Sequence, residues 1–168
     1  HGGETGWAHE EVLQLSDINS WDNRDRLPVF VTATCEFSRY DDPERISAGE
    51  QVLLNPLGGG ISLFTTSRPT FGTPNLSINK SFYKYALPEA GSAHPRMGDI
   101  ISKAKRESGS DENGRKFLLL GDPALRITTP ELKVVTTHFN ELPVDASPDT
   151  IGALSTVKVA GMITSPGG

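Results

Sequence analysis

The sequence contains one cysteine, Cys35, among its 168 residues. A single thiol excludes an intramolecular disulfide and leaves the redox compartment undetermined. The thiol is therefore either a small apolar packing residue or a reactive group. The four histidines, His1, His9, His94 and His138, lack the close ligand spacing that a zinc site would need. We therefore expect no metal and no cofactor.

Long apolar runs and an excess of basic residues are also missing. No stretch approaches the roughly 20 apolar residues that a membrane-spanning helix requires. The net charge of -5 argues against a nucleic-acid partner, because a phosphate backbone is bound by a concentrated positive face. The chain begins at His1 without an initiator methionine or a signal peptide, so we expect a piece of a longer protein.

Two short apolar runs indicate buried strands, one at residues 27–33, directly before Cys35, and one at 61–66. A helix is expected between them at residues 44–54, ended by Asn55-Pro56. Strand, helix and strand in this order form a βαβ unit, which is almost always a right-handed crossover in a parallel sheet. Ligands of such sheets bind beyond the carboxyl ends of the strands, and Cys35 occupies that position.

The remaining pattern predicts further helices and then a change of class. Helices are expected at residues 7–21, with Ser16 as a cap, at 77–86 and at 96–108. An exposed loop at 108–114 and an apolar run at 117–120 follow the last of these helices. After a boundary near residues 128–130, the β-branched segments 132–137 and 156–160 are typical of the opening strands of an all-β sandwich.

His1 is the candidate base for the Cys35 thiol. A neighbouring imidazolium favours the thiolate, and the imidazole can return a proton to the leaving group. Gly2 after it lets the backbone turn sharply and point an N–H at a developing oxyanion. On the residues alone a packing role for Cys35 stays open, and His9 and His94 are interpreted as surface residues.

A substrate cleft is expected around the same strand ends. Ser67 and Arg68 follow the strand next to that of Cys35, and loops at strand ends often carry function. Arg68 offers a contact for a substrate carboxylate, and Glu36 follows Cys35 directly. We therefore predict that Glu36, Ser67 and Arg68 line the cleft.

Four motifs carry a resemblance to a known family. They are His1-Gly2-Gly3-Glu4-Thr5-Gly6-Trp7, the segment Val29 to Cys35, Gly58-Gly59-Gly60-Ile61, and Phe117 to Arg126 with its Leu120-Gly121-Asp122-Pro123. Over about residues 1 to 127 the chain resembles the gingipain family of caspase-like cysteine peptidases. The cysteine lies in Thr34-Cys35-Glu36 and not in the caspase pattern Gln-Ala-Cys, so aspartate specificity is not implied.

The resemblance implies a fold and a set of roles. The fold is α/β: the C-terminal part of a caspase-like three-layer sandwich with a mainly parallel sheet over residues 1–129, then the beginning of an immunoglobulin-like β-sandwich over 130–168. His1 matches the catalytic histidine, Cys35 the nucleophile, and the backbone N–H groups of Gly2 and Cys35 the oxyanion hole. The family's strands before the histidine are absent, so we expect this piece to be inactive alone.

The resemblance also implies a setting. It points to the type IX secretion enzymes, which remove C-terminal sorting signals from cargo proteins at the bacterial outer membrane surface, with lipopolysaccharide as a possible acyl acceptor and other secretion subunits as partners. Water or an amine as the acceptor stays open. Two alternatives also stay open: a non-catalytic scaffold that docks cargo, and a broad extracellular proteinase of the gingipain kind.

Overall fold

A computed structural model describes residues 2–8, 11–87, 93–109, 112–128, 132–146 and 150–164. His1, which the sequence analysis assigns as the base, lies outside the described residues. The chain divides into two compact units, His1–Ile127 and Thr128–Gly168. The assignment of these parts as a catalytic and an immunoglobulin-like domain stays a prediction.

The sheet of the first unit has the order β4-β5-β6, formed by β4 (Val29–Val31), β5 (Ser62–Thr66) and β6 (Phe117–Gly121). β4 and β5 are parallel, with α2 (Ala48–Leu54) between them in the chain, so the predicted βαβ unit is confirmed. β6 is antiparallel to β5, which makes the described sheet mixed and not mainly parallel. The helices between β5 and β6 return the chain to the edge where β5 ended, because Phe117 pairs with Thr66.

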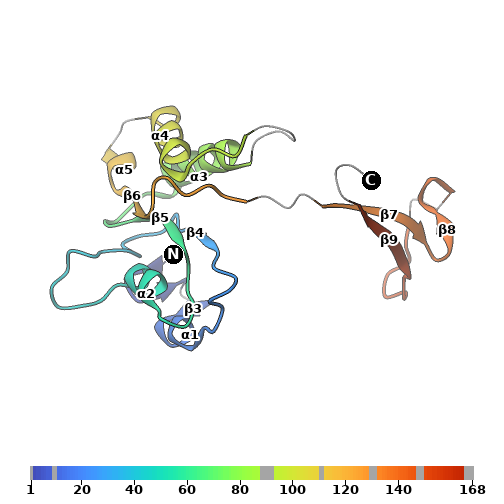
Figure 1. The fold of residues 1–168 in the computed structure, drawn as a ribbon, viewed down its shortest axis with the longest axis horizontal. Helices are drawn as coiled ribbons and strands as arrows, with labels where there is room; N and C mark the ends of the chain where they lie inside the picture. The colour runs from blue at the N-terminus through green and yellow to red at the C-terminus, as the bar shows by residue number, and fades with distance from the viewer. Residues whose placement is uncertain are drawn as a thin grey trace. The chain divides into compact units, whose positions relative to one another are not determined.

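Helices cover both faces of this sheet, which gives three layers (Figure 1). One core cluster joins α3 (Gly72–Ala86) and α4 (Met97–Glu107) to the face that carries Phe64, and the other joins α1 (Leu15–Ser20) and α2 to the face that carries Leu63. Consecutive residues of a strand point to opposite faces, so β5 supplies both cores. Its five residues are all buried, as expected for a central strand.

The N-terminal segment differs from the single helix expected at residues 7–21. It forms a small antiparallel sheet of β1 (Gly2–Gly3), β2 (Gly6–Trp7) and β3 (Leu13–Gln14), and the helix α1 is confined to Leu15–Ser20. The glycines explain the difference, because a Cβ at Gly6 would lie 2.3 Å from the carbonyl oxygen of Leu13. Only glycine permits this close approach of two strands.

Helix boundaries elsewhere follow the pattern with three corrections, the first of which is that α2 begins at Ala48 and not at residue 44. α4 matches the expected helix at 96–108, whereas α3 begins at Gly72, five residues earlier than expected, with Pro74 in its first turn, where proline is tolerated. The expected loop at 108–114 contains part of a short helix, α5 (Glu112–Arg115). No helix in the described ranges is both long and apolar enough to cross a membrane.

Ser47 caps the N-terminus of α2. Its hydroxyl accepts from the backbone N–H of Glu50 at 3.5 Å, and its backbone N–H donates to the Glu50 carboxylate at 2.9 Å, which forms a capping box. Ser47→Ala should lower the free energy of unfolding by about 1 kcal/mol. Denaturant titration of the full-length protein measures this change.

Ser16 supplies the matched control. The structure places the N-cap of α1 at Gln14, whose backbone N–H donates to Asp17 at 2.8 Å, so the predicted cap at Ser16 is wrong. Ser16→Ala should therefore change stability by less than about 0.5 kcal/mol. Equal losses from the two substitutions would contradict the assignment of the caps.

The second unit contains a three-stranded antiparallel sheet of order β8-β7-β9. Its elements are β7 (Lys133–Phe139), β8 (Leu142–Pro143), a 3-10 turn (Val144–Ala146) and β9 (Val159–Thr164). β7 overlaps the strand expected at 132–137, and β9 begins three residues later than the strand expected at 156–160. The start of an immunoglobulin-like sandwich stays a prediction.

Candidate active site

Cys35 lies just beyond the carboxyl end of β4, in a loop that is fixed on both sides. The hydroxyls of Thr32 and Ser38 hydrogen-bond the buried Thr65 hydroxyl at 2.6 and 2.7 Å. The backbone N–H of Ser38 also donates to the carbonyl oxygen of Thr66 at 2.9 Å. Both ends of the loop are therefore attached to β5, and Cys35 is held between them.

The thiol of Cys35 is half-buried and contacts the segment that follows β5. Its Sγ accepts from the backbone N–H of Thr70 at 3.4 Å and donates to the carbonyl oxygen of the same residue at 3.5 Å. Cys35 also borders a cavity of about 460 Å³, which Trp7 and Asn75 line as well. Cys35 therefore borders space that a ligand can enter, which favours a reactive over a packing role.

The residue after Cys35 has an unusual backbone. Glu36 has a φ of +52°, in the left-handed region that residues other than glycine seldom adopt. Such conformations carry a cost that the surrounding structure must offset, and they are concentrated at functional sites. The backbone thus changes direction sharply immediately after the thiol.

Gly2 lies against the residue that precedes Cys35. A Cβ at Gly2 would be 2.6 Å from the hydroxyl oxygen of Thr34 and 2.9 Å from the carbonyl oxygen of Gly6, distances that no real side chain tolerates. The backbone of Gly2 is therefore packed directly on Thr34. The segment that begins at His1 and the loop of Cys35 are neighbours, although they are more than thirty positions apart in the sequence.

Backbone contacts attach both segments to the first turn of α2, and an ion pair joins the segments to each other. The backbone N–H groups of Ala48 and Gly49 donate to the carbonyl oxygens of Glu4 and Phe37 at 2.7 and 2.8 Å. Arg39, in the loop after Cys35, also forms an ion pair with the Glu4 carboxylate at 2.9 Å. These N–H groups have no partner within the helix, so the helix end is a natural place to dock two loops.

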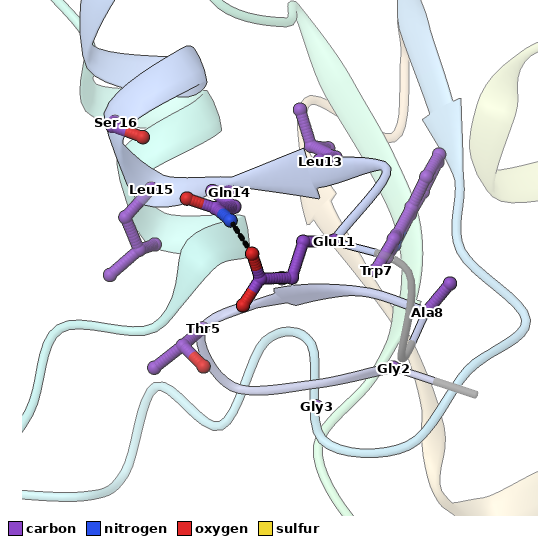
Figure 2. Close-up of a pocket in the computed structure, with 11 residues that line it drawn as sticks. Gly2, Gly3, Thr5, Trp7, Ala8, Glu11, Leu13, Gln14, Leu15 and Ser16 are labelled. Atoms are coloured by element: carbon purple, nitrogen blue, oxygen red, sulfur yellow. Dashed lines mark hydrogen bonds between the residues drawn. The ribbon is translucent and has the colours of Figure 1, made fainter.

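A second cavity, of about 630 Å³, lies along the N-terminal segment (Figure 2). It shares Trp7 and Ala8 with the cavity beside Cys35 and is also lined by Gly2. The side-chain amide of Gln14 donates to the Glu11 carboxylate at 2.6 Å at its rim. The two cavities therefore border on Trp7, which pairs with Gly2, the glycine that packs on Thr34.

The predicted substrate-cleft residues Glu36, Ser67 and Arg68 are not among those that line the cavity beside Cys35. Arg68 instead makes a two-pronged ion pair with Asp41, at 2.9 and 2.5 Å. The hydrogen bond from this guanidinium lowers the pKa of the Asp41 carboxyl. A contact of Arg68 with a substrate carboxylate would have to displace Asp41, and the cleft assignment stays a prediction.

Side chains that the sequence analysis did not single out contact the site. Asn75 and Asn113 are buried, and Asn75 donates to the carbonyl oxygen of Ala33, two residues before Cys35, at 3.2 Å. Asn75 lies before the expected start of its helix at residue 77, so the pattern gave no reason to choose it. No sequence signal marks a buried amide whose partners are this distant.

Of the other histidines, only His94 can be compared with the cavity beside Cys35, and it is not among the lining residues. His9 lies outside the described residues, and His138 belongs to the second unit. Within the described ranges no group of three His, Cys, Asp or Glu side chains is placed to hold a metal ion. The expectation that no metal or cofactor takes part stays a prediction.

Comparisons with solved structures show the fold. The Arg-specific cysteine proteinase gingipain R matches with a TM-score of 0.65 and 14% identity, over 81% of this chain and 34% of that chain. The complex of the pro- and mature domains of RgpB from Porphyromonas gingivalis matches with the same score and identity, over 81% and 35%. A structure described only as a protease matches with a TM-score of 0.67 and 14% identity, over 95% and 40%.

The chain thus spans between about a third and two fifths of the length of these structures. No curated protein matches the chain. The sequence profile of peptidase family C25 matches residues 1–128, which is well over half of the sequence. Together with the caspase-like α/β fold shared with gingipain R, this match shows that the chain belongs to peptidase family C25.

Proposed function

We propose that this chain carries the nucleophile and the general base of a cysteine peptidase, with Cys35 and His1 in these roles. The observation that most supports the pairing is that Gly2 is packed on Thr34. A Cβ added at Gly2 would lie 2.6 Å from the Thr34 hydroxyl oxygen. The residue after His1 and the residue before Cys35 are therefore in contact. Because the chain belongs to family C25 and brings these two segments together, we place the thiol chemistry here.

The reaction follows from the chemistry of the two groups. The Cys35 sulfur attacks the peptide carbonyl while its proton passes to the imidazole of His1, and a carbon–sulfur bond forms. The backbone N–H groups of Gly2 and Cys35 stabilise the negative charge on the carbonyl oxygen. The carbon–nitrogen bond then breaks, and His1 returns the proton to the departing amine. The remaining thioester is resolved by water or by a second amine.

The proposed substrate is the C-terminal sorting signal of cargo proteins secreted by a type IX system. This finer proposal rests on the resemblance of four motifs to PorU, the enzyme of that system which removes such signals. It implies a place at the outer surface of a bacterium and secretion subunits as partners. Anchoring of the cargo would follow if an amine of lipopolysaccharide accepts the acyl group from Cys35.

Mass analysis of the products tests the proposal and identifies the acceptor. Full-length protein is incubated with a tagged cargo protein that ends in a sorting signal, with and without a small primary amine. We expect cleavage before the signal. With the amine present, we expect a second product that is heavier than the hydrolysed cargo by the mass of the amine less one water. The thioester on Cys35 requires both products to arise at the same peptide bond.

Three outcomes are informative. Cargo with a scrambled sorting signal serves as the matched control and should stay intact, since a dedicated processing enzyme ignores unrelated peptides. Cleavage of both cargo proteins points to a broad proteinase and contradicts the sorting role. Hydrolysed product alone, at every amine concentration, rules out transfer, and no cleavage of any cargo contradicts the peptidase proposal.

A further inference from the structure

Thr70 contacts the Cys35 sulfur through its backbone. The N–H donates to Sγ at 3.4 Å, the carbonyl oxygen lies 3.5 Å from Sγ, and the hydroxyl oxygen lies 3.8 Å from it. The carbonyl can accept the proton of the thiol, whereas the N–H, and at a longer distance the hydroxyl, can donate to the sulfur once it is negatively charged. Hydrogen bonds from N–H groups to an anion are about twice as strong as those between neutral groups.

Asn75 holds Thr70 in this position. Its side-chain amide donates to the hydroxyl of Thr70 at 2.9 Å and to the carbonyl oxygen of Ala33 at 3.2 Å. One side chain therefore links the segment after β5 to the strand end that carries Cys35. Asn75 is only 8% exposed, so water does not compete effectively for these bonds.

Asn113 holds Asn75 and the residue after Thr70. Its amide nitrogen donates to the side-chain oxygen of Asn75 at 3.1 Å, and its own oxygen accepts from the backbone N–H of Phe71 at 2.9 Å. Asn113 is only 4% exposed. Two buried amides with satisfied partners thus fix the backbone of residues 70 and 71 in a single orientation.

We propose that the backbone N–H of Thr70 is a fixed donor to the Cys35 thiolate, and that Asn75 and Asn113 are positioning residues which aim it at the sulfur. The consequence for catalysis rests on the proposed function, in which Cys35 is the nucleophile. This N–H would keep the sulfur ionised while the imidazole of His1 holds the proton. It comes from the loop after β5, and not from the residues assigned to the oxyanion hole.

Alkylation of Cys35 at two pH values tests this inference. The rate of reaction with iodoacetamide at pH 7 depends on the fraction of thiolate, whereas at pH 10, well above the pKa of about 8.5 of a free cysteine, it depends mainly on access to the sulfur. In the full-length protein, Thr70→Val removes the hydroxyl that Asn75 holds and leaves the side chain nearly the same size. We expect the ratio of the rates at pH 7 and pH 10 to fall about three- to tenfold.

Further variants separate this role from a structural one. Thr70→Ser keeps the hydroxyl and should restore the ratio, and Asn113→Ala should lower it in the same direction as Thr70→Val. Thr73→Val, on the exposed first turn of α3, is the matched control and should leave the ratio unchanged. Each rate is measured by the mass of the peptide that contains Cys35.

Two results would overturn the inference. An unchanged ratio in both Thr70→Val and Asn113→Ala shows that Thr70 does not stabilise the thiolate. Equal slowing at both pH values shows that the substitutions only change access to the sulfur. Neither result bears on peptide cleavage, which is measured separately, so the proposed function can survive the failure of this inference.

Discussion

Replacement of Cys35 by alanine in the full-length protein should lower the rate of cleavage of a sorting-signal substrate by about a thousandfold or more. The reason is chemical, because no other residue of this sequence has a thiol that could form the thioester. The fold should survive, since Cys35 is half-buried in a loop whose ends are held by Thr32 and Ser38. Cleavage is followed by mass analysis, and folding by thermal unfolding.

Two companion variants sharpen this test. Cys35→Ser keeps the shape of the side chain but has a far weaker nucleophile at neutral pH, so it should be nearly as inactive as Cys35→Ala. Ser102→Ala, on an exposed position of α4, is the control for mutation itself and should cleave at the normal rate. Normal cleavage by Cys35→Ala would sink the enzymatic proposal and favour a non-catalytic scaffold.

Gly2→Ala should lower the rate of cleavage by about a hundredfold. The added Cβ would lie 2.6 Å from the Thr34 hydroxyl and 2.9 Å from the carbonyl oxygen of Gly6, so the backbone must move. A shift of about 1 Å in a catalytic group can cost this much, and Gly2 directly follows His1, the base in the proposed function. Steady-state rates on one substrate measure the loss.

Gly3 supplies the matched control for this experiment. A Cβ at Gly3 has no heavy atom within 4 Å, so Gly3→Ala should leave the cleavage rate within a factor of about two. Thr34→Ala added to Gly2→Ala removes the closer of the two obstacles and should recover part of the activity. Equal rates for Gly2→Ala and Gly3→Ala would show that the contact with Thr34 has no bearing on the site.

Sequence patterns predicted the elements that depend on local burial and missed those that depend on contacts between separate segments. The apolar runs before Cys35 and at β5 predicted two neighbouring strands correctly, because burial on both faces leaves a continuous apolar signal. The N-terminal segment was predicted as a helix over residues 7–21, but Trp7 pairs with Leu13 in a small sheet and the helix begins only at Leu15. Spacing of apolar residues does not reveal the close backbone approach at Gly6.

The amino-acid sequence by itself determined the one available thiol, its place at a strand end, the βαβ unit around it and the resemblance to the family. Only the tertiary structure decided that Gly2 packs on Thr34, that Arg68 is paired with Asp41, and that buried amides hold Thr70 against the sulfur. The physical reason is that periodicity and local propensity report burial and helix ends. Hydrogen bonds from side chains to partners thirty or more positions away depend on how the layers pack, and no local pattern encodes them.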